Sequence, residues 1–214
     1  MPMRAAREAL ERLREGNLRF ASDERDPDAI LHTTRRAELT QGQEPFAIIL
    51  GCSDSRVPAE LVFDQGLGDL FVIRVAGNIV APSQVGSVEF AAARFGTRLV
   101  VVLGHSECGA ILATIEELRR PNENQSPNLR AIVDRVRPAV EGLIAAKGGA
   151  AGGAAIGDTA LVEEAVRANI RASVAGLRHG SRILEDLVHA NGLLIVGAEY
   201  CLKSGRVTFF DDAA

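Results

Sequence analysis

Five side chains with the potential for metal chemistry lie in two short segments of the chain. The first segment carries Cys52, Asp54 and Arg56, and the second carries His105 and Cys108. Thiolate and imidazole are the usual ligands of zinc in tetrahedral protein sites. Three protein ligands leave a fourth position for water or substrate, which is typical of catalytic rather than structural zinc. The two thiols and the imidazole therefore predict one zinc ion per chain.

The spacing within each segment can bring these groups to one place. His105 and Cys108 are three residues apart across an expected strand-to-helix turn, so both side chains can face one ion. Cys108 would lie at a helix N-terminus, where the helix dipole and the free amides favour a thiolate. In extended backbone, residues two apart point to the same side, so the Asp54 carboxylate can reach the metal or its water. Arg56 can then hold that carboxylate with paired hydrogen bonds.

Each feature has a plainer interpretation when it is taken alone. A single buried cysteine is usually a core residue, and a histidine at a strand end can simply satisfy a backbone group. A Cys-x-Asp-x-Arg string can be a turn with a surface ion pair. The combination of all three favours a metal site. Cys201, beside Tyr200 near the end of the chain, lies outside this combination and is interpreted as a structural thiol.

Short apolar runs alternate with longer amphipathic segments along the chain. This pattern predicts an α/β fold with a mostly parallel central sheet, helices on both faces and an N-terminal helical arm. Strands are expected at 46–50, 70–75, 99–103 and 193–198, and a final strand at 206–210 should form an antiparallel C-terminal edge. Helices are expected at 3–21, 84–95, 108–118, 129–147 (with an irregularity at Pro138) and 158–190.

Such a sheet would bring the two chemical segments together. Ligands of parallel sheets bind beyond the carboxyl ends of the strands, at the point where the strand order reverses. Cys52 comes directly after the strand expected at 46–50, and His105 comes directly after the strand expected at 99–103. If these strands are neighbours, the carboxyl edge of the sheet is the place for the site.

Composition narrows the class of protein. The chain has 214 residues, of which 47% are hydrophobic, and this favours a single domain over residues 1–214. Its 24 basic and 28 acidic residues give a net charge of −4, which argues against a nucleic-acid partner. No apolar run approaches the ~20 residues that span a bilayer, and the N-terminus lacks the apolar core of a signal peptide. A soluble, cytoplasmic protein with no membrane partner is therefore expected.

The two chemical segments also resemble a known family. Cys52–Arg56 and Gly104–Gly109 match the two zinc motifs of the β-class carbonic anhydrases. The resemblance extends to Glu15–Phe20, to Phe71–Asn78 and to the hairpin at Tyr200–Gly205, so it covers almost the whole chain. The glycine-rich segment at 148–153 carries no matching motif and is interpreted as a flexible surface loop.

The resemblance implies zinc-dependent, reversible hydration of carbon dioxide to bicarbonate and a proton, by attack of zinc-bound hydroxide. It implies a homodimer, leaves pairing into tetramers open, and makes the helix at 3–21 an arm across the partner. It implies zinc ligands, an acid–base pair, a substrate-binding amide and an apolar pocket wall supplied by a neighbouring subunit. The implied zinc ligands are Cys52, His105 and Cys108, and the implied acid–base pair is Asp54 with Arg56. The implied substrate-binding amide is that of Gln43. The implied pocket wall consists of Phe71, Ala76 and Phe90, and Gly109 is also placed in the substrate pocket.

The family contains two sub-types that differ in the behaviour of the Asp–Arg pair. In one, bicarbonate in a Trp–Arg–Tyr pocket stabilises a closed state in which the aspartate binds the zinc. Arg74 and Tyr200 match two members of that pocket, but Ile49 occupies the Trp position and offers no N–H for an anion. Gln43 matches the sub-type that stays open, so Asp54 is expected to remain paired with its arginine near neutral pH.

Three other functions are alternatives to carbon dioxide hydration. Carbonyl sulfide and carbon disulfide hydrolases look similar, because their substrates are also linear molecules, and the sequence leaves this alternative open. A zinc-stabilised binding protein without catalysis would need neither Asp54, Arg56 nor Gln43. A nucleotide-binding domain is not supported, because the segment at 148–153 has no Lys-Ser/Thr and does not follow a strand.

Overall fold

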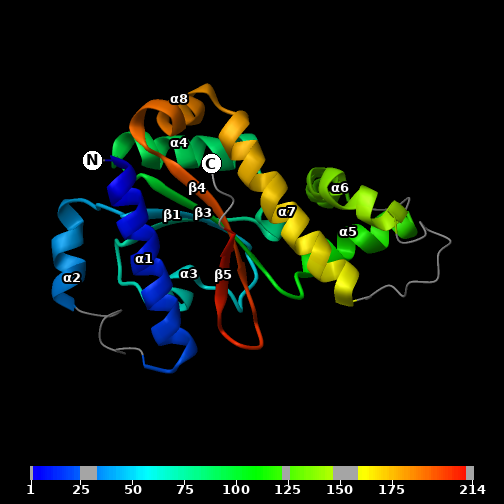
Figure 1. Cartoon of the computed structure of the whole chain (residues 1–214), viewed down its shortest axis with the longest axis horizontal. Helices are drawn as coiled ribbons and strands as arrows, with labels where there is room; N and C mark the ends of the chain where they lie inside the picture. Colours follow the sequence, from blue (N-terminus) through cyan, green and yellow to red (C-terminus); the bar gives the residue numbers. More distant parts are fainter. Residues whose placement is uncertain (1, 25–32, 122–125, 147–158, 211–214) are drawn as a thin grey trace.

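The protein is built around one five-stranded sheet, shown by a computed structural model that describes residues 2–24, 33–121, 126–146 and 159–210 (Figure 1). The strands lie in the order β2-β1-β3-β4-β5, and the first four are parallel. β5 runs antiparallel to β4 and closes one edge, as predicted. The strands are β2 (Leu70–Arg74), β1 (Ala47–Gly51), β3 (Leu99–His105), β4 (Leu194–Tyr200) and β5 (Val207–Phe210).

The two central strands are apolar because both of their faces are covered. Every residue of β1 and β3 is buried. Alternate residues of these strands belong to two separate apolar clusters, so Ile48 and Val100 pack on one face while Ile49 and Val101 pack on the other. This two-sided burial explains why the sequence shows continuous apolar runs rather than a polar–apolar alternation.

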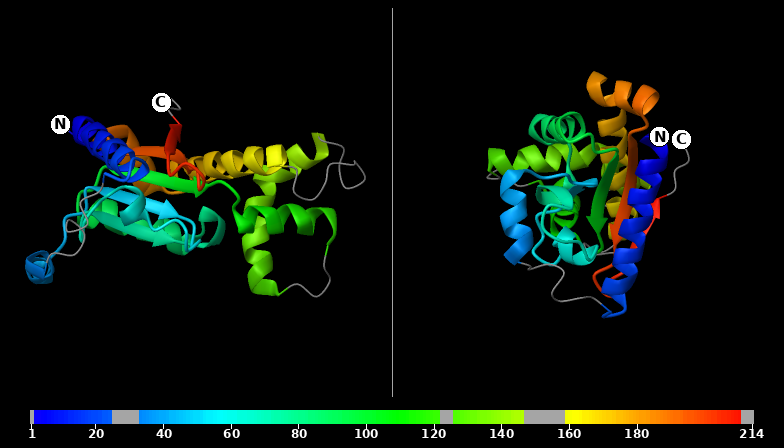
Figure 2. Two further views of the ribbon diagram at one scale, coloured as in Figure 1. Left: turned by 90° about the horizontal axis from the view of Figure 1, so that it is seen from below. Right: turned by 90° about the vertical axis from the view of Figure 1, so that its left-hand side faces the viewer.

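Helices cover both faces of the sheet, as the sequence predicts (Figure 1). On one face lie α4, α7 and α8, and α5 and α6 extend this layer beyond the carboxyl ends of the strands (Figure 2). The other face carries α1 and the short α3. The helix bounds are α1 (Pro2–Ala21), α2 (Thr33–Glu38), α3 (Ala59–Val62), α4 (Pro82–Arg94), α5 (Gly109–Arg119), α6 (Pro127–Ala146), α7 (Thr159–His179) and α8 (Arg182–Asn191), with short 3₁₀ turns η1 (Leu39–Gln41) and η2 (Ala76–Asn78).

The segment predicted to be helical at 158–190 forms two helices. α7 ends at His179 and α8 begins at Arg182. Ser181 adopts an extended conformation between them, and its hydroxyl accepts a hydrogen bond from the Leu184 N–H at 3.2 Å. This serine therefore caps the N-terminus of α8, and a new helix begins there. By contrast, α6 runs through Pro138, the position of the expected irregularity.

The N-terminal helix α1 packs on its own sheet. Leu10 and Leu13 are buried in the cluster that covers this face, and Asn17 joins the helix to the loop that precedes β5. Its role as an arm across a partner stays a prediction. The segment at 148–153 lies outside the described residues. No helix in the described part of the chain is long and apolar enough to cross a membrane.

Candidate metal centre

Three potential metal ligands converge at the carboxyl edge of the sheet. Cys52 follows β1, His105 ends β3, and Cys108 immediately precedes α5. Their ligand atoms all lie within 4.8 Å of one another, and all three side chains are buried. β1 and β3 are direct neighbours, so the strand order produces the convergence that the sequence predicts.

The ring of His105 is oriented as a metal ligand requires. Its Nδ1 lies 2.9 Å from the carbonyl oxygen of Ser106, and a carbonyl oxygen can only accept a hydrogen bond. The proton therefore belongs on Nδ1, which leaves a free lone pair on Nε2. Nε2 is fully buried and has no hydrogen-bond partner among the described residues. A buried polar atom without a partner is expensive, and a metal ion at the cluster would satisfy it.

The two thiols hold their protons unequally. The neighbouring Cys108 thiol lowers the pKa of Cys52 to about 4, against the opposing effect of burial. The Cys52 sulfur, together with burial, raises the pKa of Cys108. The pair of thiols thus gives up its first proton readily and holds the second, which the two sulfurs share. A divalent cation would replace that shared proton, because metal binding takes both thiols as thiolates. Two sulfurs and one imidazole nitrogen in a buried site fit zinc.

Asp54 and Arg56 form a paired carboxylate and guanidinium beside the cluster. The Arg56 side chain donates to both carboxylate oxygens, at 2.9 and 2.7 Å, and its backbone N–H adds a third bond at 2.9 Å. These bonds hold the pKa of Asp54 far below its usual range, although partial burial acts against them. Asp54 Oδ2 lies 3.8 Å from Nε2 of His105, so the ionised carboxylate faces the potential metal ligands.

Arg74, at the end of β2, has a role that the sequence does not reveal. Its Nε donates to the carbonyl oxygen of Cys52 at 3.0 Å, and its Nη2 donates to the carbonyl oxygen of Asp54 at 2.5 Å. The guanidinium therefore fixes the backbone of the loop that carries both groups. Arg74 matches one member of the family's anion pocket, and in this chain its guanidinium binds two backbone carbonyl oxygens.

The predicted pocket residues divide into two groups. Gly109 begins α5 directly after Cys108, and open space surrounds the position of its missing side chain. Ala76 begins η2, next to Gly77, whose backbone N–H points at the sulfur of Cys52. These two residues therefore lie beside the cluster.

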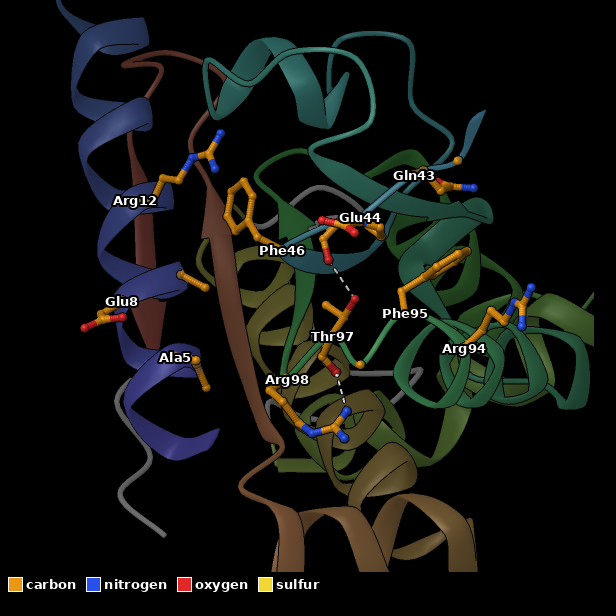
Figure 3. A pocket seen from close by; sticks show the side chains of 15 residues that line it. Ala5, Glu8, Arg12, Gln43, Glu44, Phe46, Arg94, Phe95, Thr97 and Arg98 are labelled. Carbon is orange, nitrogen blue, oxygen red and sulfur yellow. Dashed lines mark hydrogen bonds between the residues drawn. The ribbon is translucent and has the colours of Figure 1, made fainter. Parts of the chain in front are cut away.

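Gln43, Phe71 and Phe90 lie elsewhere in this chain. Gln43 precedes β1 whereas Cys52 follows it, so the length of the strand, about 15 Å, separates them. Gln43 and Phe95 line a cleft of about 840 Å³ beside α1, at the amino ends of the strands (Figure 3). Phe95 also packs against Phe71 and Phe90, with ring centroids 5.9 and 5.6 Å away.

Comparison with known proteins identifies the family. A family model described as carbonic anhydrase matches residues 47–207, which include the four parallel strands and the cluster. The chain belongs to the β-class carbonic anhydrases. A carbonic anhydrase of Mycolicibacterium smegmatis is 39% identical over 201 residues, covering 91% of this chain and 88% of the relative. Carbonic anhydrase 2 of Mycobacterium tuberculosis is 37% identical over 201 residues, covering 93% and 90%.

Solved β-carbonic anhydrases share the fold. The enzyme CafA of Aspergillus fumigatus superposes with a TM-score of 0.73 at 24% identity, over 86% of this chain and 83% of its own. The β-carbonic anhydrase CcaA superposes with a TM-score of 0.67 at 28% identity, over 95% and 85%. The sequence-based identification as a member of this family is therefore confirmed, and so is the α/β fold class.

Proposed function

We propose that this β-class carbonic anhydrase binds one zinc ion through Cys52, His105 and Cys108 and catalyses the reversible hydration of carbon dioxide to bicarbonate and a proton. The buried cluster of two thiols and an unpartnered imidazole nitrogen is the observation that carries the proposal. A zinc ion held by these residues would lower the pKa of water and so would supply a nucleophile near neutral pH.

The chain's own residues position that nucleophile. The Asp54 carboxylate, kept ionised by Arg56, is a hydrogen-bond acceptor of fixed direction that faces the cluster. It can take the hydrogen bond of an attacking water and so point the oxygen lone pair at the substrate carbon. The Nη2 of Arg56 also donates to the carbonyl oxygen of Glu107 at 3.4 Å. This hydrogen bond ties the pair to the loop that carries Cys108. A structural zinc site would need neither group, so the pair supports catalysis over a binding role.

We further propose that the active protein is a homodimer. Gln43 lies at the amino end of β1 and the cluster at its carboxyl end, so we infer that Gln43, with the aromatic cluster of Phe71 and Phe90, serves the site of a second copy. Phe90 is 54% exposed and forms an aromatic cluster with two other phenylalanines, which is the composition of a protein interface. Gln43 lines the cleft beside α1. This helix, which the sequence predicts at 3–21 as an arm across the partner, therefore borders the surface proposed for the dimer interface. The β-carbonic anhydrases of Sordaria macrospora are described as tetrameric, and the dimer proposed here leaves further pairing open.

A cytoplasmic location is part of the proposal. Three cysteines, Cys52, Cys108 and Cys201, are free thiols in the structure, and two of them would serve as metal ligands. A reducing compartment keeps such thiols available.

The matched pair of variants Cys108→Ala and Cys201→Ser tests the metal and the reaction together. We expect Cys108→Ala to lose most bound zinc and most carbon dioxide hydration, measured by metal analysis and stopped flow. Cys201 lies outside the cluster, so Cys201→Ser should retain both. Full zinc content and normal turnover in Cys108→Ala would refute the ligand assignment. Preferential turnover of carbonyl sulfide by the unmodified enzyme would instead favour the alternative substrate.

A further inference from the structure

The turn that follows β2 reaches into the candidate metal centre. The backbone N–H of Gly77, in the middle of η2, donates to the Sγ of Cys52 at 3.4 Å. Gly77 has a φ of 72° and Asn78 a φ of 43°, so two successive residues adopt the left-handed conformation. Glycine adopts this conformation freely and asparagine tolerates it better than most other residues, so the Gly-Asn pair suits the turn, and neighbouring contacts fix its position.

Two side chains of α7 provide that support. The Nδ2 of Asn169 donates to the carbonyl oxygen of Gly77 at 2.8 Å, and the hydroxyl of Ser173 donates to the carbonyl oxygen of Asn78 at 3.0 Å. Both side chains are buried, and they lie four residues apart on one face of the helix. The helix thus holds the carbonyl groups of both left-handed residues.

The close approach of α7 to the sheet sets the position of these two side chains. Ile170, between them in sequence, packs directly onto Gly104 of β3 and Gly197 of β4. A Cβ at Gly104 would lie 2.6 Å from this isoleucine, and one at Gly197 would lie 2.7 Å from it. Two glycines in the sheet therefore let the helix lie deep enough for Asn169 and Ser173 to reach the turn.

We propose that Asn169 and Ser173 are positioning residues, which hold the η2 turn so that the Gly77 N–H faces the sulfur of Cys52 and thereby set the affinity of the cluster for its metal ion. An N–H that donates to a thiolate stabilises its charge and fixes the direction in which its remaining lone pairs point. This inference rests on the proposed metal centre, and neither residue touches the cluster itself.

The zinc affinity of the metal-free protein tests the inference directly. Competition against a chelator is measured for the unmodified chain, for Asn169→Leu and for Ser173→Ala. Loss of a group that orients a metal ligand commonly weakens metal binding about 10- to 100-fold. We expect a loss of this size for Asn169→Leu. A smaller loss is expected for Ser173→Ala, because its bond is one peptide farther from Gly77.

A second asparagine of the same kind supplies the matched control. Asn17 of α1 is also buried in a helix, and its Nδ2 donates to the carbonyl oxygens of Val62 and Gly205. These contacts lie on the other face of the sheet. We expect Asn17→Leu to lower the midpoint of thermal unfolding but to leave the zinc affinity unchanged. The thiolate-to-metal charge-transfer band of the cobalt-substituted protein should shift in Asn169→Leu and not in Asn17→Leu.

Each outcome of this comparison decides the inference. Unchanged zinc affinity and cobalt spectrum in Asn169→Leu would overturn it, as would an equal loss of affinity in Asn17→Leu, which would indicate general destabilisation. If Asn169→Leu does not fold, weaker zinc binding by Ser173→Ala than by Asn17→Leu supports the inference, and equal binding overturns it. Failure of the unmodified chain to bind zinc would refute the proposed metal centre itself, and the inference with it.

Discussion

The contact between Gly104 and Ile170 predicts a specific coupling between two core substitutions. Gly104 is a buried residue of β3, directly before His105, and its backbone is extended. A methyl group added there would lie 2.6 Å from both Cγ1 and Cδ1 of Ile170. The isoleucine cannot move away easily, because it is fully buried and its Cγ2 would lie 2.7 Å from a Cβ at Gly197. Gly104→Ala should therefore strain the packing of α7 on the sheet.

The size of the effect follows from the geometry. Overpacking a buried site costs about 1–3 kcal/mol, and replacing glycine by alanine returns about 0.4–1 kcal/mol through the unfolded state. We expect Gly104→Ala to lower the free energy of unfolding by about 1–2 kcal/mol. Ile170→Val removes Cδ1 and alone costs about 0.5–1.5 kcal/mol. Ile170→Val also removes one of the two atoms that clash with the new methyl group. The double variant should therefore be about 1 kcal/mol more stable than the sum of the two single effects predicts.

Urea unfolding of the four proteins, at one protein concentration and one zinc concentration, measures this coupling. The concentrations are fixed because ligand and partner binding both change apparent stability. Gly142→Ala is the control, because this exposed glycine of α6 has open space at its Cβ and the substitution should stabilise the helix by about 0.5–1 kcal/mol. Single effects that add within about 0.5 kcal/mol would refute the packing argument.

Three further predictions concern other parts of the chain. Ser181→Ala should lower the free energy of unfolding by about 1 kcal/mol in urea titrations, because the Leu184 N–H loses its cap. A hydrogen bond from Ser204 lowers the pKa of the Cys201 thiol, so its alkylation in the zinc-loaded protein should reach half-maximal rate at a lower pH than that of an ordinary free cysteine. Ser204→Ala should move that midpoint upward, and an unmoved midpoint would contradict the assigned cause. Phe90→Arg should split the proposed dimer in sedimentation and reduce carbon dioxide hydration in parallel; a fully active monomer would disprove the shared site.

The sheet and its metal ligands could be predicted because their signals are local. The four parallel strands appear as short apolar runs, since both faces of the sheet are covered. Binding sites of parallel sheets form at the carboxyl edge, so Cys52 and His105 can be predicted to lie together from the strand positions alone. The bidentate pair of Asp54 and Arg56 follows from a spacing of two residues in the chain.

The features that the sequence did not predict depend on contacts between distant segments. Asn169 is one of several polar residues in an amphipathic helix, and nothing local indicates that it meets Gly77 across the fold. The Gly-Asn pair after β2 is a signal of a left-handed turn, but the partner that holds the turn becomes visible only in three dimensions. The helical segment at 158–190 is predictable, but the break before α8 is not marked by the apolar pattern, which continues across it; Ser181 is a residue type typical of helix starts.

The most direct test of the proposed function is a zinc titration of the metal-free enzyme, with the initial rate of carbon dioxide hydration measured by stopped flow at each step. We predict no enzymatic hydration before zinc is added, and a rate that rises in proportion to zinc and reaches its plateau at one ion per chain. Full hydration activity in the metal-free protein, or none with one zinc ion bound per chain, would contradict the proposal that Cys52, His105 and Cys108 form the catalytic metal centre.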